Sequence, residues 1–113
     1  MNQVTDVVHP TWKEAPSMIG KLTLVELKHV DATGRAVLYE QTYGIITQID
    51  RKEGIWIELH GAQAGKKLAL PADLKKFGKA PRGMYKLETT GEEIEDPDYF
   101  STWVFQHKDQ VNF

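Results

Sequence analysis

The sequence of 113 residues contains no cysteine and only two serines. The absence of cysteine excludes a disulfide scaffold, a thiolate metal site and a cysteine nucleophile. Neither Ser17 nor Ser101 stands in a G-x-S-x-G or S-x-x-K pattern, two common settings of a nucleophilic serine. The sequence therefore predicts a protein that is not an enzyme with a serine or cysteine nucleophile.

The four histidines are far apart in the chain. His9, His29, His60 and His107 form no i, i+4 pair and no H-E-x-x-H motif, so we expect no metal and no cofactor. No apolar run approaches the roughly 18 to 20 residues that span a bilayer. The first residues also lack the basic and apolar regions of a signal peptide. We therefore expect no membrane association and a cytoplasmic location.

Charge of neither sign dominates the chain. Fourteen basic and sixteen acidic residues give a formal net charge of −2, which does not favour nucleic acid or an anionic membrane as a partner. The length and the 41% hydrophobic content are typical of one compact domain. We predict an irregular N-terminal segment at 1–16, a single β-barrel domain at 17–107 and a C-terminal tail at 108–113.

The first half of the domain has the composition of two long strands. Residues 18–30 are rich in Leu, Val and Ile, and the adjacent Leu24 and Val25 predict either a strand covered on both faces or a β-bulge. Residues 36–49 form the second predicted strand. Gly44 in its middle suggests a bend or a bulge.

The second half alternates short strands with turns. Residues 55–60 show the clearest alternation, with Ile55, Ile57 and Leu59 expected in the core and Trp56 on the other face. Further strands are predicted at 66–70, 84–87 and 100–105, and one short helical turn, with Leu74 and Phe77 buried, at 71–77. This pattern predicts a mainly β fold, a small antiparallel barrel or rolled sheet of five to six strands. An SH3-like barrel is the first choice and an OB-like barrel the second.

Several short segments from 18 to 105 carry a resemblance to other proteins. They are Tyr43-Gly44-Ile45, Leu70 to Leu74, Gly83 to Leu87, Thr90-Gly91-Glu92, Asp96 to Tyr99, and Trp103. In these segments the chain resembles a group of small bacterial β-rich proteins that has no assigned activity. The resemblance implies a single bacterial domain and transfers no functional residue.

Opposite charges are segregated in the second half of the chain. Half of the basic residues fall between positions 66 and 86, and an acidic stretch follows directly. The candidate basic patch comprises Lys66, Lys67, Lys75, Lys76, Lys79 and Arg82, and the candidate acidic loop comprises Glu92, Glu93, Glu95, Asp96 and Asp98. The basic patch indicates a nucleic-acid surface or, alternatively, a solvated face. An exposed acidic loop does not raise the pKa of a carboxyl group as glycoside hydrolysis requires, so we interpret it as a surface for a basic partner.

A face with aromatic residues is the remaining candidate site. If Ile55 and Ile57 are buried, Trp56 lies outside with Glu58 and His60, and Tyr43 is a second exposed aromatic candidate. The alternative is that an N-terminal segment carrying Trp12 covers Trp56.

We therefore expect a non-enzymatic binding module, and the net negative charge favours a protein partner over nucleic acid. A bacterial toxin-immunity or inhibitor protein is a further hypothesis. The sequence leaves the oligomeric state open.

Overall fold

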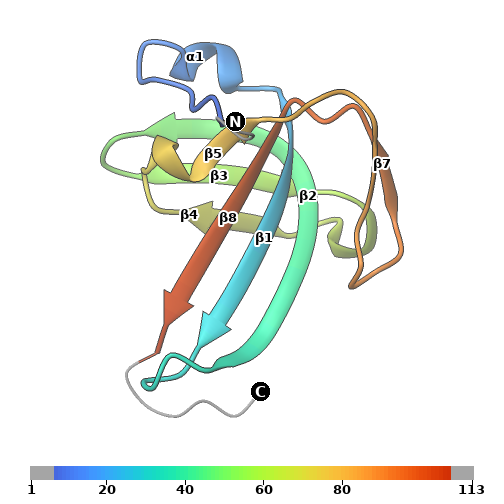
Figure 1. Ribbon diagram of the computed structural model, residues 1–113. Coiled ribbons are helices and arrows are strands. Elements are labelled where there is room, and N and C mark those ends of the chain that lie inside the picture. The colour runs from blue at the N-terminus through green and yellow to red at the C-terminus, as the bar shows by residue number, and fades with distance from the viewer. Residues whose placement is uncertain (1–6, 108–113) are drawn as a thin grey trace, which may run out of the picture.

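A computed structural model describes residues 7–107, and most of them belong to one six-stranded sheet. The strand order is β4-β3-β2-β1-β8-β5 (Figure 1). These strands are β1 (Leu22–Val30), β2 (Ala36–Asp50), β3 (Gly54–Leu59), β4 (Lys67–Leu70), β5 (Phe77–Lys79) and β8 (Tyr99–Gln106). A two-stranded ribbon of β6 (Met84–Lys86) and β7 (Glu93–Glu95) is separate. The fold is mainly β, as predicted.

The sheet does not close into a barrel, so of the two predicted forms the barrel is wrong, and the prediction that all strands are antiparallel is also wrong. Within residues 7–107 no ladder joins β4 to β5, and β1 pairs with β8 in parallel. Both strands start at the same end because the Leu22 amide donates to the Asp98 carboxylate and the Asp98 amide donates to the Leu22 carbonyl. The β6–β7 ribbon returns the chain to that end before β8 begins.

A sharp bend in β2 gives the sheet its rolled shape (Figure 1). Gly44 is the point where β2 changes partners, since it pairs with Thr23 of β1 and with Leu59 of β3. A register shift follows between Ile46 and Gln48. A Cβ at Gly44 would lie 2.2 Å from the Glu58 carbonyl oxygen. Gly44 therefore allows the close approach of the β2 and β3 backbones, and the irregularity predicted in this strand falls at the register shift that follows it.

The concave side of the sheet holds the main core. Ile55 and Ile57 are fully buried and Leu59 is 7% exposed, so the predicted alternation in this strand is confirmed. Leu24 and Val25 are both buried but belong to different apolar clusters. The strand is therefore covered on both faces, and the alternative of a bulge at these two residues is wrong, because the register is regular there.

Residues 7–16 contact the rest of the fold on the N-terminal side of the predicted domain boundary at residue 16. Helix α1 (Ala15–Met18) crosses that boundary, and Met18 is fully buried. Trp12 packs against the core and under the Arg51 guanidinium, 4.3 Å from its carbon to the ring centroid. The Lys79 amide donates to the Val8 carbonyl. The predicted tail at 108–113 lies outside the described residues.

The helical turn predicted at 71–77 is a single 3₁₀ turn, η2 (Leu74–Lys76). The Asp73 carboxylate accepts a hydrogen bond from the Lys75 amide and caps it. Leu74 and Phe77 are buried as expected. Phe77 begins β5, a strand that the sequence pattern did not predict, since its three residues Phe77–Lys79 are too few for a period of two to emerge.

The turn between β1 and β2 supplies a prediction on pH. Asp31 is buried, and the Thr33 hydroxyl donates to its carboxylate at 2.6 Å, with the Thr33 and Arg35 amides as further donors. These bonds lower the pKa of Asp31, led by that from the Thr33 hydroxyl, against the opposing effect of burial. Its contribution to stability is complete above the usual aspartate pKa and is lost as the pH falls through the lowered folded value.

We therefore expect Asp31→Asn to lower the free energy of unfolding at pH 7 and to flatten its decline in acid. Urea unfolding between pH 7 and pH 2 measures both effects. Glu58→Gln, at an exposed position, is the control. If the free energy of unfolding falls equally with pH in Asp31→Asn and in the unsubstituted protein, the lowered pKa of Asp31 does not contribute to stability.

Candidate functional site

The face of β1, β2 and β8 that points away from the main core is built from three rows of side chains. We call it the outer face. Each row takes one residue from β2, one from β1 and one from β8, because the two ladders have a regular register there. The rows are Tyr43-Leu24-Phe100, Gln41-Glu26-Thr102 and Tyr39-Lys28-Val104.

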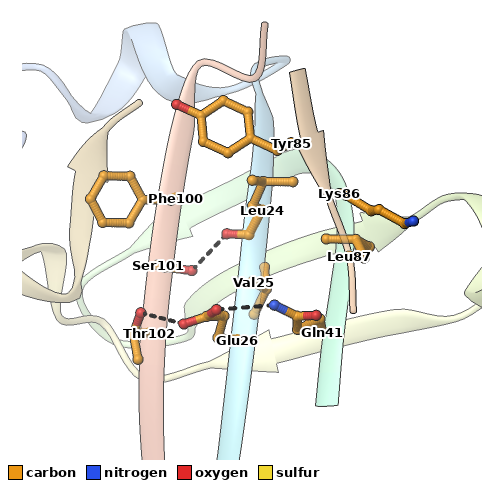
Figure 2. A pocket seen from close by; sticks show the side chains of 10 residues that line it. All are labelled: Leu24, Val25, Glu26, Gln41, Tyr85, Lys86, Leu87, Phe100, Ser101 and Thr102. Atoms are coloured by element: carbon orange, nitrogen blue, oxygen red, sulfur yellow. Dashed lines mark hydrogen bonds between the residues drawn. The ribbon is translucent and has the colours of Figure 1, made fainter. Parts of the chain in front are cut away.

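The β6–β7 ribbon covers only the first of these rows. Leu87 and Ile94 pack against Leu24 and form a small second core with it. The ribbon ends before the second row, so a pocket of about 320 Å³ remains between its end and the outer face (Figure 2). We call this the Glu26 pocket. Its apolar walls include Leu24, Leu87, Phe100 and the ring of Tyr85.

The carboxylate of Glu26 is held in a fixed position inside this pocket. One oxygen, Oε2, accepts from the Tyr39 hydroxyl at 2.8 Å and from Gln41 Nε2 at 3.1 Å. The other, Oε1, accepts from the Thr102 hydroxyl at 3.3 Å. Burial, followed by the neighbouring Glu26 carboxylate, raises the pKa of Tyr39, so its hydroxyl stays protonated as a donor at neutral pH.

Gln41 also ties the pocket to the turn after β6. Its side-chain oxygen accepts from the amides of Glu88 and Thr89, and the Thr89 hydroxyl contacts the Gln41 backbone. One residue thus fixes both the Glu26 carboxylate and the ribbon that forms one wall. The pocket is therefore built before any ligand arrives, which lowers the entropic cost of binding.

The four residues of the predicted aromatic face all lie on one side of the β2–β3 pair. Trp56 is half-buried, its ring N–H donates to the Glu53 carbonyl, and Glu58 is exposed. Tyr43 and His60 meet edge to face, with 6.2 Å between ring centroids. Burial and then the nearby Glu92 raise the pKa of Tyr43. Tyr43 and His60 therefore adjoin the Glu92 turn, away from Trp56.

The acidic segment is not a loop throughout, which corrects that part of the prediction, whereas Glu93, Glu95 and Asp98 are exposed as expected. Glu93 and Glu95 lie in strand β7, and Glu93 pairs across the ribbon with Lys86. The other three carboxylates hold the backbone together: Glu92 accepts from the Ala62 amide, Asp96 from the Gly83 amide and Asp98 from the Leu22 amide. Sequence reasoning missed this because the donors are distant in the chain.

The six basic residues of the predicted patch occupy several places. Lys66 precedes β4 and Lys67 begins it, whereas Lys75 and Lys76 follow its other end, and all four are exposed. Lys79 forms an ion pair with Glu14 at 3.1 Å, and Arg82 contacts Asp96 at 3.4 Å. The two lysine pairs therefore lie at opposite ends of β4. Lys79 and Arg82 each have a carboxylate beside them.

Glu26 is the site residue that sequence reasoning did not single out. A signal was present, since Leu22, Leu24, Glu26 and Lys28 alternate with buried Thr23, Val25 and Leu27. Glu26 lies on the same face of β1 as Leu22 and Leu24, so the apolar part of that face ends at this carboxylate. What covers that surface is a ribbon about sixty residues later, which the period of the strand does not reveal.

Comparisons with known proteins give no further assignment. Neither a scan against protein-family models nor searches of curated proteins and of solved structures found a match. The resemblance to small bacterial β-rich proteins therefore stays a prediction. Among residues 7–107 no cluster of three or more histidine or acidic side chains is arranged to hold a metal. The same part of the chain contains no helix with the length and apolarity of a membrane-crossing one.

Proposed function

We propose that this protein is a non-enzymatic binding module that captures a basic side chain of a protein partner in the Glu26 pocket. The observation that carries the proposal is the half-buried Glu26 carboxylate, held by three donors in a pocket with apolar walls. A carboxylate has about four acceptor positions. Three are used here, so one remains for an N–H group from a partner.

The shape and charge of the pocket suit an arginine or lysine of the partner. Leu24, Leu87 and the ring of Tyr85 offer apolar contact to the methylene stem, and Glu26 offers the charge to its head. Lys86 also lines the pocket, but its side chain extends away from Glu26 (Figure 2) and it pairs across the ribbon with Glu93. The nearest fixed charge for an entering cation is therefore Glu26.

The third row of the outer face extends the contact surface beyond the pocket. Tyr39 is 42% exposed and Val104 is 58% exposed, and both flank Lys28. Exposed aromatic and aliphatic side chains next to a charged pocket are typical of a protein interface. Trp56, the anchor favoured by the sequence, lies on the β2–β3 part of the sheet.

The test uses a short peptide, acetyl-Leu-Arg-Leu-amide, and its neutral isostere with citrulline in place of arginine. We expect the arginine peptide to shift the backbone amide NMR signals of β1 and β8 around Glu26. Glu26→Gln is expected to weaken binding about tenfold because a charge-assisted hydrogen bond is lost. Glu58→Gln, which removes an exposed carboxylate of β3, is the matched control and is expected to bind normally.

Equal binding of the arginine and citrulline peptides would overturn the proposal. An equal loss in Glu26→Gln and Glu58→Gln would do the same, since it would indicate nonspecific attraction to negative charge. A toxin-immunity role is a special case of this proposal in which the partner is a basic effector protein. An SH3-like outline and a bacterial, cytoplasmic origin remain predictions beside it.

Nucleic-acid binding is retained as the alternative because η2 presents Lys75 and Lys76 on the surface. Oligonucleotide affinity that falls steeply between low and moderate salt, and that is lost in Lys75→Glu/Lys76→Glu, would favour this alternative. No affinity at low salt would eliminate it.

A further inference from the structure

Two histidines meet at the end of the sheet that lies away from helix α1 (Figure 1). His29 is close to the end of β1, and His107 directly follows β8, 78 positions later in the chain. The parallel pairing of β1 with β8 brings them together, and the His107 amide donates to the Val30 carbonyl. Spacing along the sequence does not reveal this pair, because it depends on which strands lie side by side.

The two imidazole rings face each other through one nitrogen each. His29 Nδ1 lies 3.2 Å from His107 Nε2, and the ring centroids are 5.4 Å apart with 23° between the ring planes. At this distance the two nitrogens share one proton in a hydrogen bond. The distance also suits a metal ion, since two nitrogens at about 2.0 to 2.1 Å from a tetrahedral zinc ion are roughly 3.3 to 3.4 Å apart.

Glu40 fixes the orientation of the His29 ring. Its Oε1 atom lies 3.3 Å from Nε2 of His29, which is the ring nitrogen that His107 does not contact. A carboxylate in this place favours a proton on Nε2, so that Nδ1 is the nitrogen that accepts a hydrogen bond or binds a metal. The ring of Phe105 also packs beside His29, with 5.6 Å between centroids. The ring is thus held in the orientation that metal binding requires.

The histidine pair is within reach of an ion from solution. The side chain of His29 is 18% exposed and that of Glu40 is 48% exposed, and His107 is half-buried. Within residues 7–107 no group of three or more histidine or acidic side chains is arranged around one metal position. Glu40 contacts the other nitrogen of His29, so its place is beside a ligand and not on the ion. The protein therefore offers two ligands, and water completes the coordination.

We propose that His29 and His107 bind a divalent transition-metal ion, with Glu40 as the positioning residue for His29. Imidazole nitrogen suits Zn²⁺, Cu²⁺ and Ni²⁺, whereas Mg²⁺ and Ca²⁺ prefer oxygen ligands. Binding releases the proton shared by the two rings to water, and each ring turns so that both lone pairs point at the ion. This inference does not rest on the Glu26 pocket, because Glu26 and His29 are three residues apart in β1 and lie on opposite faces.

Zn²⁺ alone is the probe, added to the full chain. Titration calorimetry measures the affinity, and the NMR signals of the histidine ring nitrogens locate the ion. We expect a dissociation constant on the order of 10 μM, with the ring signals of His29 and His107 shifted and those of His9 and His60 unchanged. Mg²⁺ at the same concentrations is expected to leave all four sets of signals in place.

Variants separate the two ligands from the positioning residue. His29→Gln and His107→Gln are each expected to weaken Zn²⁺ binding by more than tenfold, because one of two ligands is lost. Glu40→Gln is expected to weaken it about tenfold while the same two ring nitrogens still shift, as for a residue that acts through a ligand. His60→Gln and Glu58→Gln are the matched controls and are expected to bind Zn²⁺ normally. The backbone amide spectrum of each variant shows whether the fold is retained.

Several results would overturn the inference. One is the absence of Zn²⁺ binding up to about 1 mM, an affinity too weak for a specific site. Another is a Zn²⁺-dependent shift at His9 or His60 in place of His29 and His107, or the same response to Mg²⁺. An equal loss of affinity in His29→Gln and His60→Gln would also refute it. If Glu40→Gln binds Zn²⁺ as tightly as the unsubstituted protein, Glu40 does not position the ligand.

Discussion

Gly44→Ala is expected to destabilise the protein by about 3 kcal/mol, because the new methyl group has no space. A Cβ at this position would lie 2.2 Å from the Glu58 carbonyl oxygen and 2.9 Å from the Leu59 Cα atom. Both atoms belong to the backbone of β3, which the ladders to β2 and β4 hold in place. Relief of the clash would separate β2 from β3 at the point where β2 begins to pair with β3.

Gly34→Ala is the matched control for this substitution. Gly34 has a φ of 89°, but nothing lies within 4 Å of its Cβ position. Its substitution therefore reports the backbone cost alone, about 1 kcal/mol. Chemical denaturation of both variants measures the two losses. Equal losses of stability in the two variants would show that the close packing of the β3 backbone against Gly44 has no effect on stability.

Phe77→Ala is expected to cost about 4 kcal/mol, since it removes one of the largest fully buried side chains. The ring meets Trp103 edge to face, with 6.0 Å between centroids, and its strand β5 pairs with β8. The Phe77 carbonyl also lies 2.6 Å from the Nδ1 atom of His9. The substitution leaves a cavity where the N-terminal segment, β5 and β8 meet.

Phe105→Ala provides the comparison at a half-buried phenylalanine of β8. Because Phe105 is only partly removed from water, its loss is expected to be less than half that of Phe77→Ala. Thermal and urea unfolding of the two variants give the measurement. A similar loss for both would mean that Phe77 is not a central packing residue.

The elements with a clear local pattern were predicted correctly. The alternation of Ile55, Ile57 and Leu59 identified β3 and its buried face, and the spacing of Leu74 and Phe77 identified the residues buried around η2. In each case the information lies within a few residues of the chain. The period of a strand or the spacing of a helical turn is enough to assign it.

The candidate site was predicted less well. The prediction that Trp56 lies on the face of β3 opposite Ile55 and Ile57 was correct. The pocket of the outer face, however, lies at Glu26, in a row formed by residues of β1, β2 and β8. The acidic segment illustrates the same difficulty. Asp98 binds the Leu22 amide across 76 positions of sequence, and Glu92 binds the Ala62 amide across 30. The composition shows only that this segment is acidic. It does not show that its carboxylates accept hydrogen bonds from backbone amides distant in the sequence.

The sequence by itself determined the mainly β class, the turns, the buried faces of individual strands and the lack of cysteine-based chemistry. These properties depend on residue type and local periodicity. Only the tertiary structure decided the parallel pairing of β1 with β8, the open sheet and the Glu26 pocket. Each depends on which distant backbones meet: the sheet bends where β3 begins to pair with β2, and the Glu26 pocket exists because β6 and β7 cover only part of the outer face.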